Sequence, residues 1–208
     1  MPTTKAGLAR LIERAGIRDQ RLVAAFRAVD RADFVPDQLI DQAYLDRPLG
    51  IPHRQVTTQP SLVARMVEAA AVTSDDRVLE IGTGYGFQTA LLARLGRAVV
   101  SVERHSSLAE AARHNLERTG VTNASIVVAD GWKGRPDRAP FDSIIVSAAA
   151  EEVPPMLADQ LREGGRLVIP IREEADDVYL FVKRRGRLER TRLVSPASFV
   201  PLVPGRPT

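Results

Sequence analysis

Cysteine is absent from this chain of 208 residues. The absence excludes disulfide bonds, thiolate metal ligands and a cysteine nucleophile, and the remaining residues suggest no metal site. Long hydrophobic runs are missing as well, since no run approaches the roughly eighteen apolar residues needed to cross a bilayer. Residues 1–14 lack the apolar centre of a secretory signal peptide. These absences predict a cytoplasmic protein that does not bind membranes.

Aromatic residues and net charge are both scarce. Aromatics make up 5% of the chain, and the formal net charge is +3, whereas proteins that bind single strands of nucleic acid combine basic grooves with stacking aromatics. Basic residues do gather near the C-terminus, at Lys183, Arg184, Arg185, Arg187, Arg190 and Arg192. Leucines interleave with them, which indicates the solvent face of a β-hairpin. We therefore expect no nucleic-acid partner.

The first part of the chain is predicted to be helical. Apolar residues recur every three or four positions over residues 5–29, as is typical of amphipathic helices, and Gly16 divides the stretch in two. Residues 34–55 are punctuated by proline and glycine and are predicted to be irregular. Another helix is expected over residues 61–70.

Strands and helices alternate from residue 77 onward. Buried strands are predicted at residues 77–81, 98–103, 125–129, 141–147 and 165–171, with helices between most of them. This order is typical of a doubly wound α/β sheet with mostly parallel strands. Residues 178–194 instead indicate a hairpin, so we expect the sheet to end in antiparallel pairing.

The loop after the first of these strands is rich in glycine. It reads Glu-Ile-Gly-Thr-Gly-Tyr-Gly-Phe over residues 80–87, and glycine lets a backbone turn sharply and approach a ligand at the start of the next helix. The dinucleotide fingerprint needs a small residue three positions after its second glycine, where this chain has Phe87. A pyrophosphate is therefore a poor fit, and Glu80 favours a cationic ligand.

Acidic residues stand at the ends of the next two strands. Glu103 ends the second strand, where a carboxylate can accept both hydroxyl groups of a ribose. Asp130 and Gly131 follow the third strand, where a side chain or amide can contact an adenine edge. Each acid alone would be interpreted as facing solvent. Ligands of doubly wound sheets bind at the carboxyl ends of the strands, so the set predicts a site for an adenosyl group without phosphates.

These motifs, in this order, resemble those of the protein-L-isoaspartate O-methyltransferases. The resemblance is carried by residues 78–86, 101–104, 130–131, 140–146 and 164–170. It extends to residues 31–36, 43–60 and 199–203, which a general methyltransferase domain would not explain. Because the match covers nearly the whole chain, the sequence is identified as a member of this family.

The resemblance implies a Rossmann-like methyltransferase fold with an N-terminal helical extension. S-adenosyl-L-methionine would be the cofactor and S-adenosyl-L-homocysteine the product. The methyl group would pass to the carboxylate of L-isoaspartyl residues in proteins or peptides, which starts their repair through a succinimide. We expect a monomer with a single domain over residues 1–208. Its parts would be an N-terminal helical and substrate-side segment (1–60), a cofactor-binding core (61–175), and a C-terminal hairpin and tail (176–208).

The resemblance also implies which residues form the site. The expected cofactor-binding residues are Glu80, Gly82, Thr83, Gly84, Tyr85, Gly86, Gln88, Glu103, Arg104, Asp130 and Gly131. Thr58 stands where the family has its active-site serine and is expected to aim the acceptor carboxylate, although a plain helix cap would also explain its hydroxyl. The expected substrate-binding residues are His53, Gln55, Thr57 and Thr58.

The chain departs from the family pattern at several positions. The family segment usually reads Gly-Gln-Thr-Ile-Ser-Gln-Pro, and here residues 54–60 read Arg-Gln-Val-Thr-Thr-Gln-Pro. Arg54 and Arg172 replace glycines, and Tyr85 replaces a small residue. A specialised relative that methylates an aspartate of one dedicated peptide therefore stays open. So does a protein that binds the cofactor without turnover, although Glu103 and the hydroxyl of Thr58 speak against it.

No general base is expected. A carboxylate with a pKa near ~4 is already ionised at neutral pH, so attack on the sulfonium methyl needs alignment and desolvation rather than proton removal. His105 and His114 are expected on the exposed face of a helix.

Overall fold

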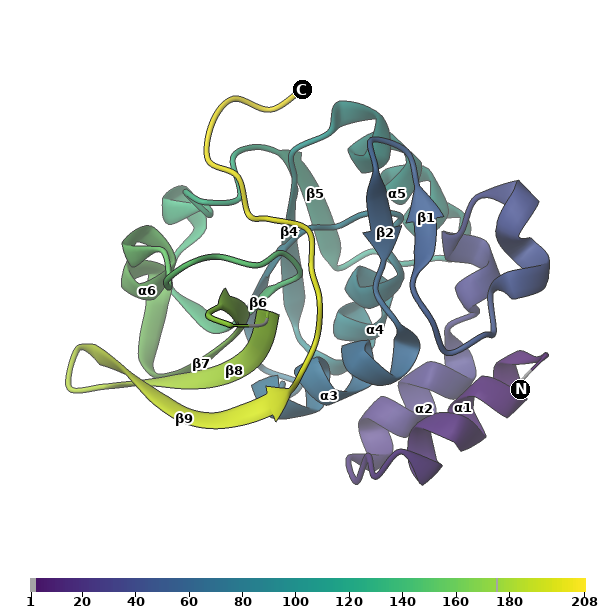
Figure 1. Ribbon diagram of the computed structural model, residues 1–208, viewed down its shortest axis with the longest axis horizontal. Coiled ribbons are helices and arrows are strands. Elements are labelled where there is room, and N and C mark those ends of the chain that lie inside the picture. Colours follow the sequence, from purple (N-terminus) through teal and green to yellow (C-terminus); the bar gives the residue numbers. More distant parts are fainter. Residues whose placement is uncertain (1–2, 175) are drawn as a thin grey trace.

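The computed structural model describes residues 3–174 and 176–208, and a seven-stranded sheet forms its centre (Figure 1). The strand order is β5-β4-β3-β6-β7-β8-β9. The bounds are β3 Arg77–Ile81, β4 Ala98–Glu103, β5 Ala124–Val128, β6 Phe141–Val146, β7 Leu161–Arg172, β8 Asp176–Arg184 and β9 Arg187–Ser195. The five strands from β5 to β7 pair in parallel, whereas β8 and β9 pair antiparallel. The doubly wound sheet with an antiparallel end is confirmed.

Helices cover both faces of this sheet. The α-helices are α1 Lys5–Arg14, α2 Gln20–Ala28, α3 Pro60–Ala70, α4 Phe87–Leu95, α5 Ser106–Arg118 and α6 Pro155–Gln160, and the 3-10 helices are η1 Arg31–Phe34, η2 Asp37–Gln42 and η3 Pro136–Arg138. Alternate residues of β3 face opposite sides, because side chains alternate along a strand. Val78 joins the core beneath α1 to α4, and Leu79 joins the core beneath α6.

The parallel register brings the ends of the central strands together. Ile81 of β3 pairs with Val102 of β4 and with Val146 of β6, so the loops that follow these strands leave from one edge of the sheet. That edge carries the glycine-rich loop and Glu103. The site expected from the sequence therefore has a common location.

The segment predicted to be irregular contains a small hairpin, which corrects that prediction. Strand β1 (Leu49–Ile51) pairs antiparallel with β2 (Gln55–Thr57), and this pair is separate from the main sheet. Three-residue strands between prolines carry too little alternation to be recognised in a sequence. In Figure 1 the hairpin is drawn above α4 and in front of α5.

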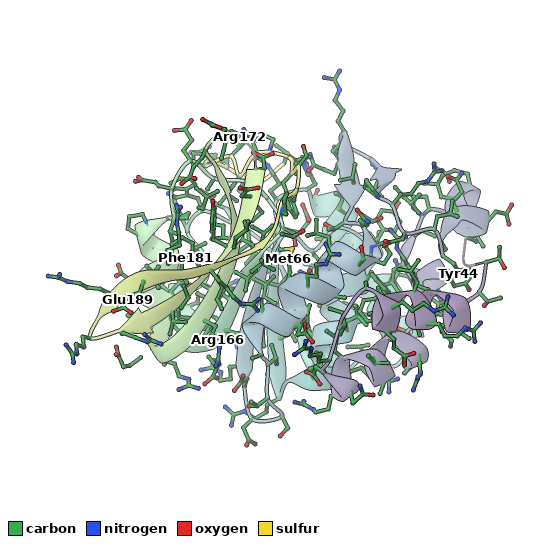
Figure 2. The ribbon with its side chains drawn as sticks, turned by 60° about the horizontal axis from the view of Figure 1, so that its bottom comes forward. Tyr44, Met66, Arg166, Arg172, Phe181 and Glu189 are labelled. Carbon is green, nitrogen blue, oxygen red and sulfur yellow. The ribbon has the colours of Figure 1, made fainter. Side chains whose placement is uncertain are left out.

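The molecule is elongated, with the charged hairpin and the N-terminal helices at opposite ends. Figure 2 places Glu189 of β9 at one end and Tyr44 at the other, with Met66 of α3 between them. Within the described residues, no helix is long and apolar enough to cross a membrane. The division at residues 60 and 175 remains a prediction, and residues 1, 2 and 175 lie outside the described part.

Candidate active site

The loop between β3 and α4 has backbone angles that require glycine. Gly82, Gly84 and Gly86 have φ values of 93°, 56° and 94°, a left-handed region that residues with a side chain rarely adopt. A Cβ atom at Gly82 would also lie 3.3 Å from Cβ of Ser147. The loop can therefore pass close to the end of β6 and begin α4 with its amides at the sheet edge.

Glu80 lies behind this loop rather than on the cavity. Its side chain has no exposed surface, and its oxygens accept hydrogen bonds from Gln88 Nε2, from the hydroxyl of Thr89 and from the hydroxyl of Ser101. Burial raises the pKa of Glu80 to about 7, although these three donors act in the opposite direction. The expectation that Glu80 faces a cationic ligand is therefore revised, because its oxygens are directed at neighbouring side chains.

Gln88 shows a different kind of burial. Its amide nitrogen is held by Glu80 at 2.9 Å and by Ser147 at 3.2 Å. Its amide oxygen is buried and has no hydrogen-bond partner among the described residues, and Gln88 lines the cavity beside the glycine loop. A buried acceptor without a partner is rare in folded proteins, so this oxygen is suited to a donor group on a ligand.

Glu103 connects the glycine loop to the start of α5. Its Oε2 atom accepts the amide of Gly84 at 2.9 Å, and Oε1 accepts the amides of Arg104 at 2.9 Å and His105 at 3.1 Å. The residue lines the cavity. Since a carboxylate offers about four lone-pair directions, Glu103 retains capacity for a ligand hydroxyl on its open side.

Asp130, Gly131 and Arg104 are covered by the end of the chain. Asp130 Oδ2 accepts the amide of Gly205 at 3.0 Å, and Nη1 of Arg104 donates to the carbonyl of Val203 at 3.3 Å. A Cβ atom at Gly131 would lie 3.5 Å from Leu202 and closer still to Ile81. The expected adenine-binding residues thus sit at the common edge, beneath residues 202–205.

The cavity joins the cofactor side to the substrate side. Of the residues expected from the sequence, it is lined by Gln55, Thr57, Thr58, Gly82, Thr83, Gly84, Tyr85, Gln88 and Glu103. Glu80, Gly86, Arg104, Asp130, Gly131 and His53 lie outside its lining. Its volume of about 70 Å³ is below the ~300–1,000 Å³ of pockets that hold drug-sized ligands. The cavity is therefore smaller than a site that holds a ligand of that size.

Thr58 lies on this cavity and does not cap a helix. Helix α3 begins at Pro60, and its N-cap residue is Gln59, which makes no side-chain capping bond. Asp46 instead accepts the first free amide, that of Ser61, at 2.8 Å. No hydrogen bond to the Thr58 hydroxyl is found among the described residues. The helix-cap interpretation of Thr58 is wrong, because the chain turns into α3 one residue later.

Arg31 is the residue of this region that the sequence did not reveal. Only 1% of it is exposed, and its guanidinium donates to the carbonyls of Ala43 and Leu45 at 3.0 and 2.9 Å, and of Arg47 and Thr58 at 3.2 and 3.3 Å. It also donates to the hydroxyl of Thr57 at 2.8 Å. Burial lowers the pKa of Arg31 to about 10. The Thr57 hydroxyl therefore helps to hold Arg31. Arg31 in turn binds the backbone on both sides of the β1–β2 hairpin, at Arg47 before it and at Thr58 after it.

Comparison with known proteins agrees with this geometry. The family profile described as protein-L-isoaspartate(D-aspartate) O-methyltransferase matches residues 3–206. The chain belongs to this family. It is 47% identical over 193 residues to the protein-L-isoaspartate O-methyltransferase of Koribacter versatilis, covering 92% of this chain and 86% of that one. Its identity to the enzyme of the same name from Methanoculleus marisnigri is 50%, over 92% and 87% of the two chains.

Solved structures of the family superimpose closely. A protein-L-isoaspartate O-methyltransferase structure with 31% identity has a TM-score of 0.84, covering 95% of this chain, which spans only 65% of that longer one. A Plasmodium falciparum structure described as a putative family member in complex with S-adenosyl-L-homocysteine has 24% identity and a TM-score of 0.85, over 98% and 99% of the chains. The latter likeness concerns the fold alone.

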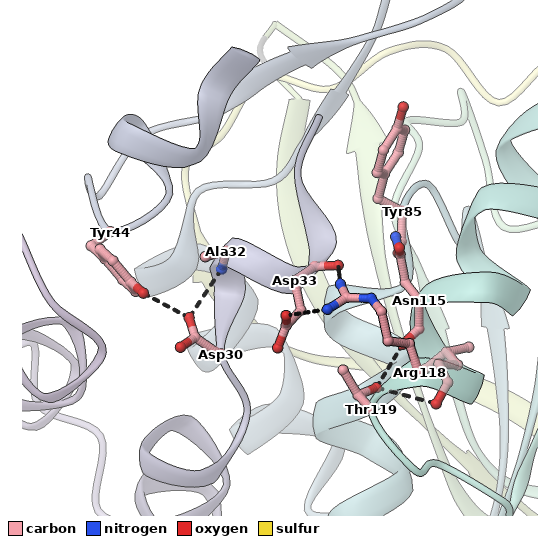
Figure 3. A network of polar contacts seen from close by, with 9 residues as sticks. Asp30, Ala32, Asp33, Tyr44, Tyr85, Asn115, Arg118 and Thr119 are labelled. Carbon is pink, nitrogen blue, oxygen red and sulfur yellow. Dashed lines mark hydrogen bonds and ion pairs between the residues drawn. The ribbon is translucent and has the colours of Figure 1, made fainter. Parts of the chain in front are cut away.

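Among the departures from the family pattern, Tyr85 is held through its backbone. Asn115 Nδ2 donates to the Tyr85 carbonyl at 3.1 Å, and the Tyr85 ring points away from this contact (Figure 3). Nearby, Arg118 binds Asp33 at 2.8 Å, and the Tyr44 hydroxyl donates to Asp30 at 2.8 Å. The Arg118–Asp33 pair fixes η1 against α5, and the Tyr44–Asp30 contact ties the start of η1 to the segment after η2.

The two arginine departures have different settings. Arg54 takes a left-handed φ of 57° in the hairpin turn, where the family's glycine would fit without strain. Arg172 ends β7 and forms an ion pair with Asp176 at 2.8 Å. Asp176 also accepts the amide of Phe199, a residue of the cavity wall. Arg172 therefore supports the wall through Asp176 and leaves the cavity itself unchanged.

Proposed function

We propose that this chain transfers the methyl group of S-adenosyl-L-methionine to the free carboxylate of L-isoaspartyl residues in proteins or peptides. The observation that carries the proposal is that Thr58 and the glycine loop with Glu103 line the same cavity. A carboxylate oxygen forms a bond to the methyl carbon as the carbon–sulfur bond breaks, and its electron pair remains on sulfur in S-adenosyl-L-homocysteine. The neighbouring backbone amide nitrogen can then attack the methyl ester, which releases methanol and forms a succinimide, and this begins the repair.

The acceptor groups around the glycine loop fit this cofactor. The free oxygen of Gln88 would accept the ammonium of its methionine part, and Glu103 would accept the ribose hydroxyls. Gly82, Thr83, Gly84, Tyr85 and Gly86 would shape the backbone around it, while Arg104, Asp130 and Gly131 would meet the adenine once residues 202–205 shift. Glu80 would act indirectly, by holding Gln88. The cofactor supplies an electrophilic methyl group on a sulfonium.

The acceptor carboxylate has to be oriented toward the methyl group, and it needs no general base. An isoaspartyl carboxylate is ionised at neutral pH, so Thr58 would donate a hydrogen bond to the oxygen that does not react and turn the other toward the methyl. Gln55 reaches the same cavity. Correct orientation is worth several orders of magnitude in rate when two reactants are brought together.

The test compares two peptides that differ only in the linkage of one residue. With labelled S-adenosyl-L-methionine, the isoaspartyl peptide should gain a methyl group that mild base removes, and the matching aspartyl peptide should not. Label that survives alkaline treatment would contradict carboxylate methylation. Cofactor binding without turnover on any peptide would favour the non-catalytic alternative.

Finer points of the proposal concern substrate range, assembly and location. We propose a general repair activity rather than one dedicated peptide, because the cavity wall retains the hydroxyl and the ribose-binding carboxylate of the family pattern. The chain would act as a monomer in the cytoplasm, without nucleic acid or membrane partners. Comparable turnover on several unrelated isoaspartyl peptides, and light scattering of the purified chain, check these points.

A further inference from the structure

Two histidines from distant parts of the chain stack face to face beside the cofactor loop. His53 lies in the turn between β1 and β2, and His105 directly precedes α5, rather than lying on an exposed helix face as expected. Their ring centroids are 4.3 Å apart and the ring planes differ by 3°. His53 Nε2 lies 2.8 Å from Oγ of Ser107, and His105 Nδ1 lies 2.8 Å from the hydroxyl of Thr208. The pair connects the hairpin, the start of α5 and the C-terminal tail.

The turn that presents His53 is strained. His53 and Arg54 have φ values of 62° and 57°, and a left-handed backbone is unfavourable for a residue with a side chain. Strain of this kind persists only where surrounding contacts hold it, and it clusters at functional sites. At this turn the ring contacts of His53 with His105 and Ser107 are such contacts.

The histidine pair stands beside the wall that the hairpin contributes to the cavity. Ile51 and Gln55 line the cavity from the hairpin, and Gly84 and Glu103 line it from the cofactor side. The two sides also meet directly, because a Cβ atom at Gly84 would lie 3.5 Å from Cδ1 of Ile51. Thr58 follows β2 in the chain, so the position of the hairpin determines the position of its hydroxyl.

We propose that His53 and His105 are positioning residues whose stacked rings, the histidine clasp, hold the hairpin against the cofactor loop so that Thr58 is aligned with the methyl donor. The clasp rests on the role proposed for Thr58. Because the hairpin and residues 199–200 form part of the cavity wall, the clasp opens for cofactor entry and closes for methyl transfer. The clasp requires a ring at both position 53 and position 105.

The charges around the clasp give it a pH dependence. Burial lowers the pKa of His105 below 6.5, His53 acts in the same direction, Glu103 opposes it, and Arg104 lowers it further. Arg54 from the turn, and the hydroxyl and carbonyl groups of Thr208, complete the surroundings. A histidine whose folded pKa is lowered contributes full stability above 6.5 and loses it as the pH falls through the lowered value. The clasp should therefore be closed at neutral pH and open in acid.

A double-mutant cycle, measured by steady-state kinetics, tests the clasp. His53→Ala and His105→Ala should each raise KM for an isoaspartyl peptide about tenfold, and the double variant no further, because contacting residues couple. The rise in wild-type KM below pH 6.5 should be lost in all three variants.

His53→Gly separates the ring from the strained backbone. It removes the ring and relieves the strain, so the variant should be at least as stable as the wild type and should still show the higher KM. His114→Ala is the control, since His114 is exposed on α5. Additive effects, or an unchanged pH profile, would overturn the proposal.

A second measurement does not depend on turnover. The chain has only three histidines, so their ring signals can be titrated by NMR. His105 should titrate below 6.5 in the wild type and move toward 6.5 in His53→Ala. The clasp would be refuted if the pKa of His105 were the same in the wild type and in His53→Ala. A chain that methylates no isoaspartyl peptide, but shows this coupling, would contradict the proposed function and leave the clasp standing.

Discussion

At the scale of single residues, the site separates side chains that face the cavity from those that hold them. Thr58, Gln88 and Glu103 line the cavity, whereas Glu80 is buried behind it among three donors. Mutations in the first group should change binding or turnover, and mutations in the second should change stability and its pH dependence.

Thr58 tests the acceptor side. Thr58→Ala removes the hydroxyl that we propose aims the carboxylate, and loss of a positioning group can lower the rate about a hundredfold. Thr58→Ser should stay active, since the lost methyl is worth only about 1 kcal/mol of packing. Because Thr58 does not cap α3, the melting temperature of both variants should stay near that of the wild type. A large loss of stability with normal turnover of the folded fraction would contradict the assignment.

Glu103 tests the cofactor side. Glu103→Ala removes the charged acceptor that we propose for the ribose hydroxyls. The binding free energy of S-adenosyl-L-homocysteine, measured by calorimetry, should therefore weaken by on the order of 1.5–3 kcal/mol. Glu110→Ala is the matched control, because Glu110 is exposed on α5. Equal affinities for the two variants would remove Glu103 from the site.

Glu80 tests how a buried carboxyl group changes the unfolding free energy with pH. Its pKa is raised to about 7 from 4.5, so its contribution to stability is full below pH 4.5 and is lost as the pH rises through about 7. Over that interval the wild type should lose up to about 3 kcal/mol of unfolding free energy through this group. Glu80→Gln should flatten this slope in urea titrations at several pH values. A slope that is the same in both proteins would mean that Glu80 titrates as an ordinary acid.

At the scale of elements, the β1–β2 hairpin and the loop before it depend on one buried cation. Arg31 reaches from η1 to carbonyls of the segment between η2 and α3, a region whose own apolar core consists of only a few residues. A buried guanidinium bound by carbonyls replaces the packing that this segment lacks.

Replacing Arg31 should therefore loosen the whole substrate-side segment. Lysine has one nitrogen and cannot span the same carbonyls, so Arg31→Lys should cost about 3 kcal/mol and speed hydrogen exchange over residues 43–58. Arg27→Lys is the control, since Arg27 pairs with Glu13 at the surface and such pairs contribute little. Faster exchange spread evenly over the sheet would contradict a local role.

At the scale of the whole molecule, the cofactor should act as a clamp between the parallel sheet and the segments that cover it. A ligand at a hundred times its Kd adds about 2.7 kcal/mol of stability, and for a chain of this size each kcal/mol raises the melting temperature by about 2–4 °C. S-adenosyl-L-homocysteine should therefore raise the melting temperature by roughly 5–10 °C. Glu103→Ala should show less than half of this shift at the same concentration, and an equal shift would contradict the site.

The sequence by itself determined the sheet, its antiparallel end and the family. Strand–helix alternation, glycines at left-handed positions and acids at strand ends are local signals, so they survive in a linear sequence. The residues of the glycine loop and Glu103 could be named for the same reason.

Only the tertiary structure decided which of these residues face the cavity. Glu80 and Gln88 differ in role because of what packs against each, and Arg31 becomes important only once η1 meets the segment before Thr58. The stacking of His53 on His105 joins residues 52 positions apart. Such contacts leave no periodic pattern, because they depend on where distant backbones meet rather than on the spacing of neighbours along the chain.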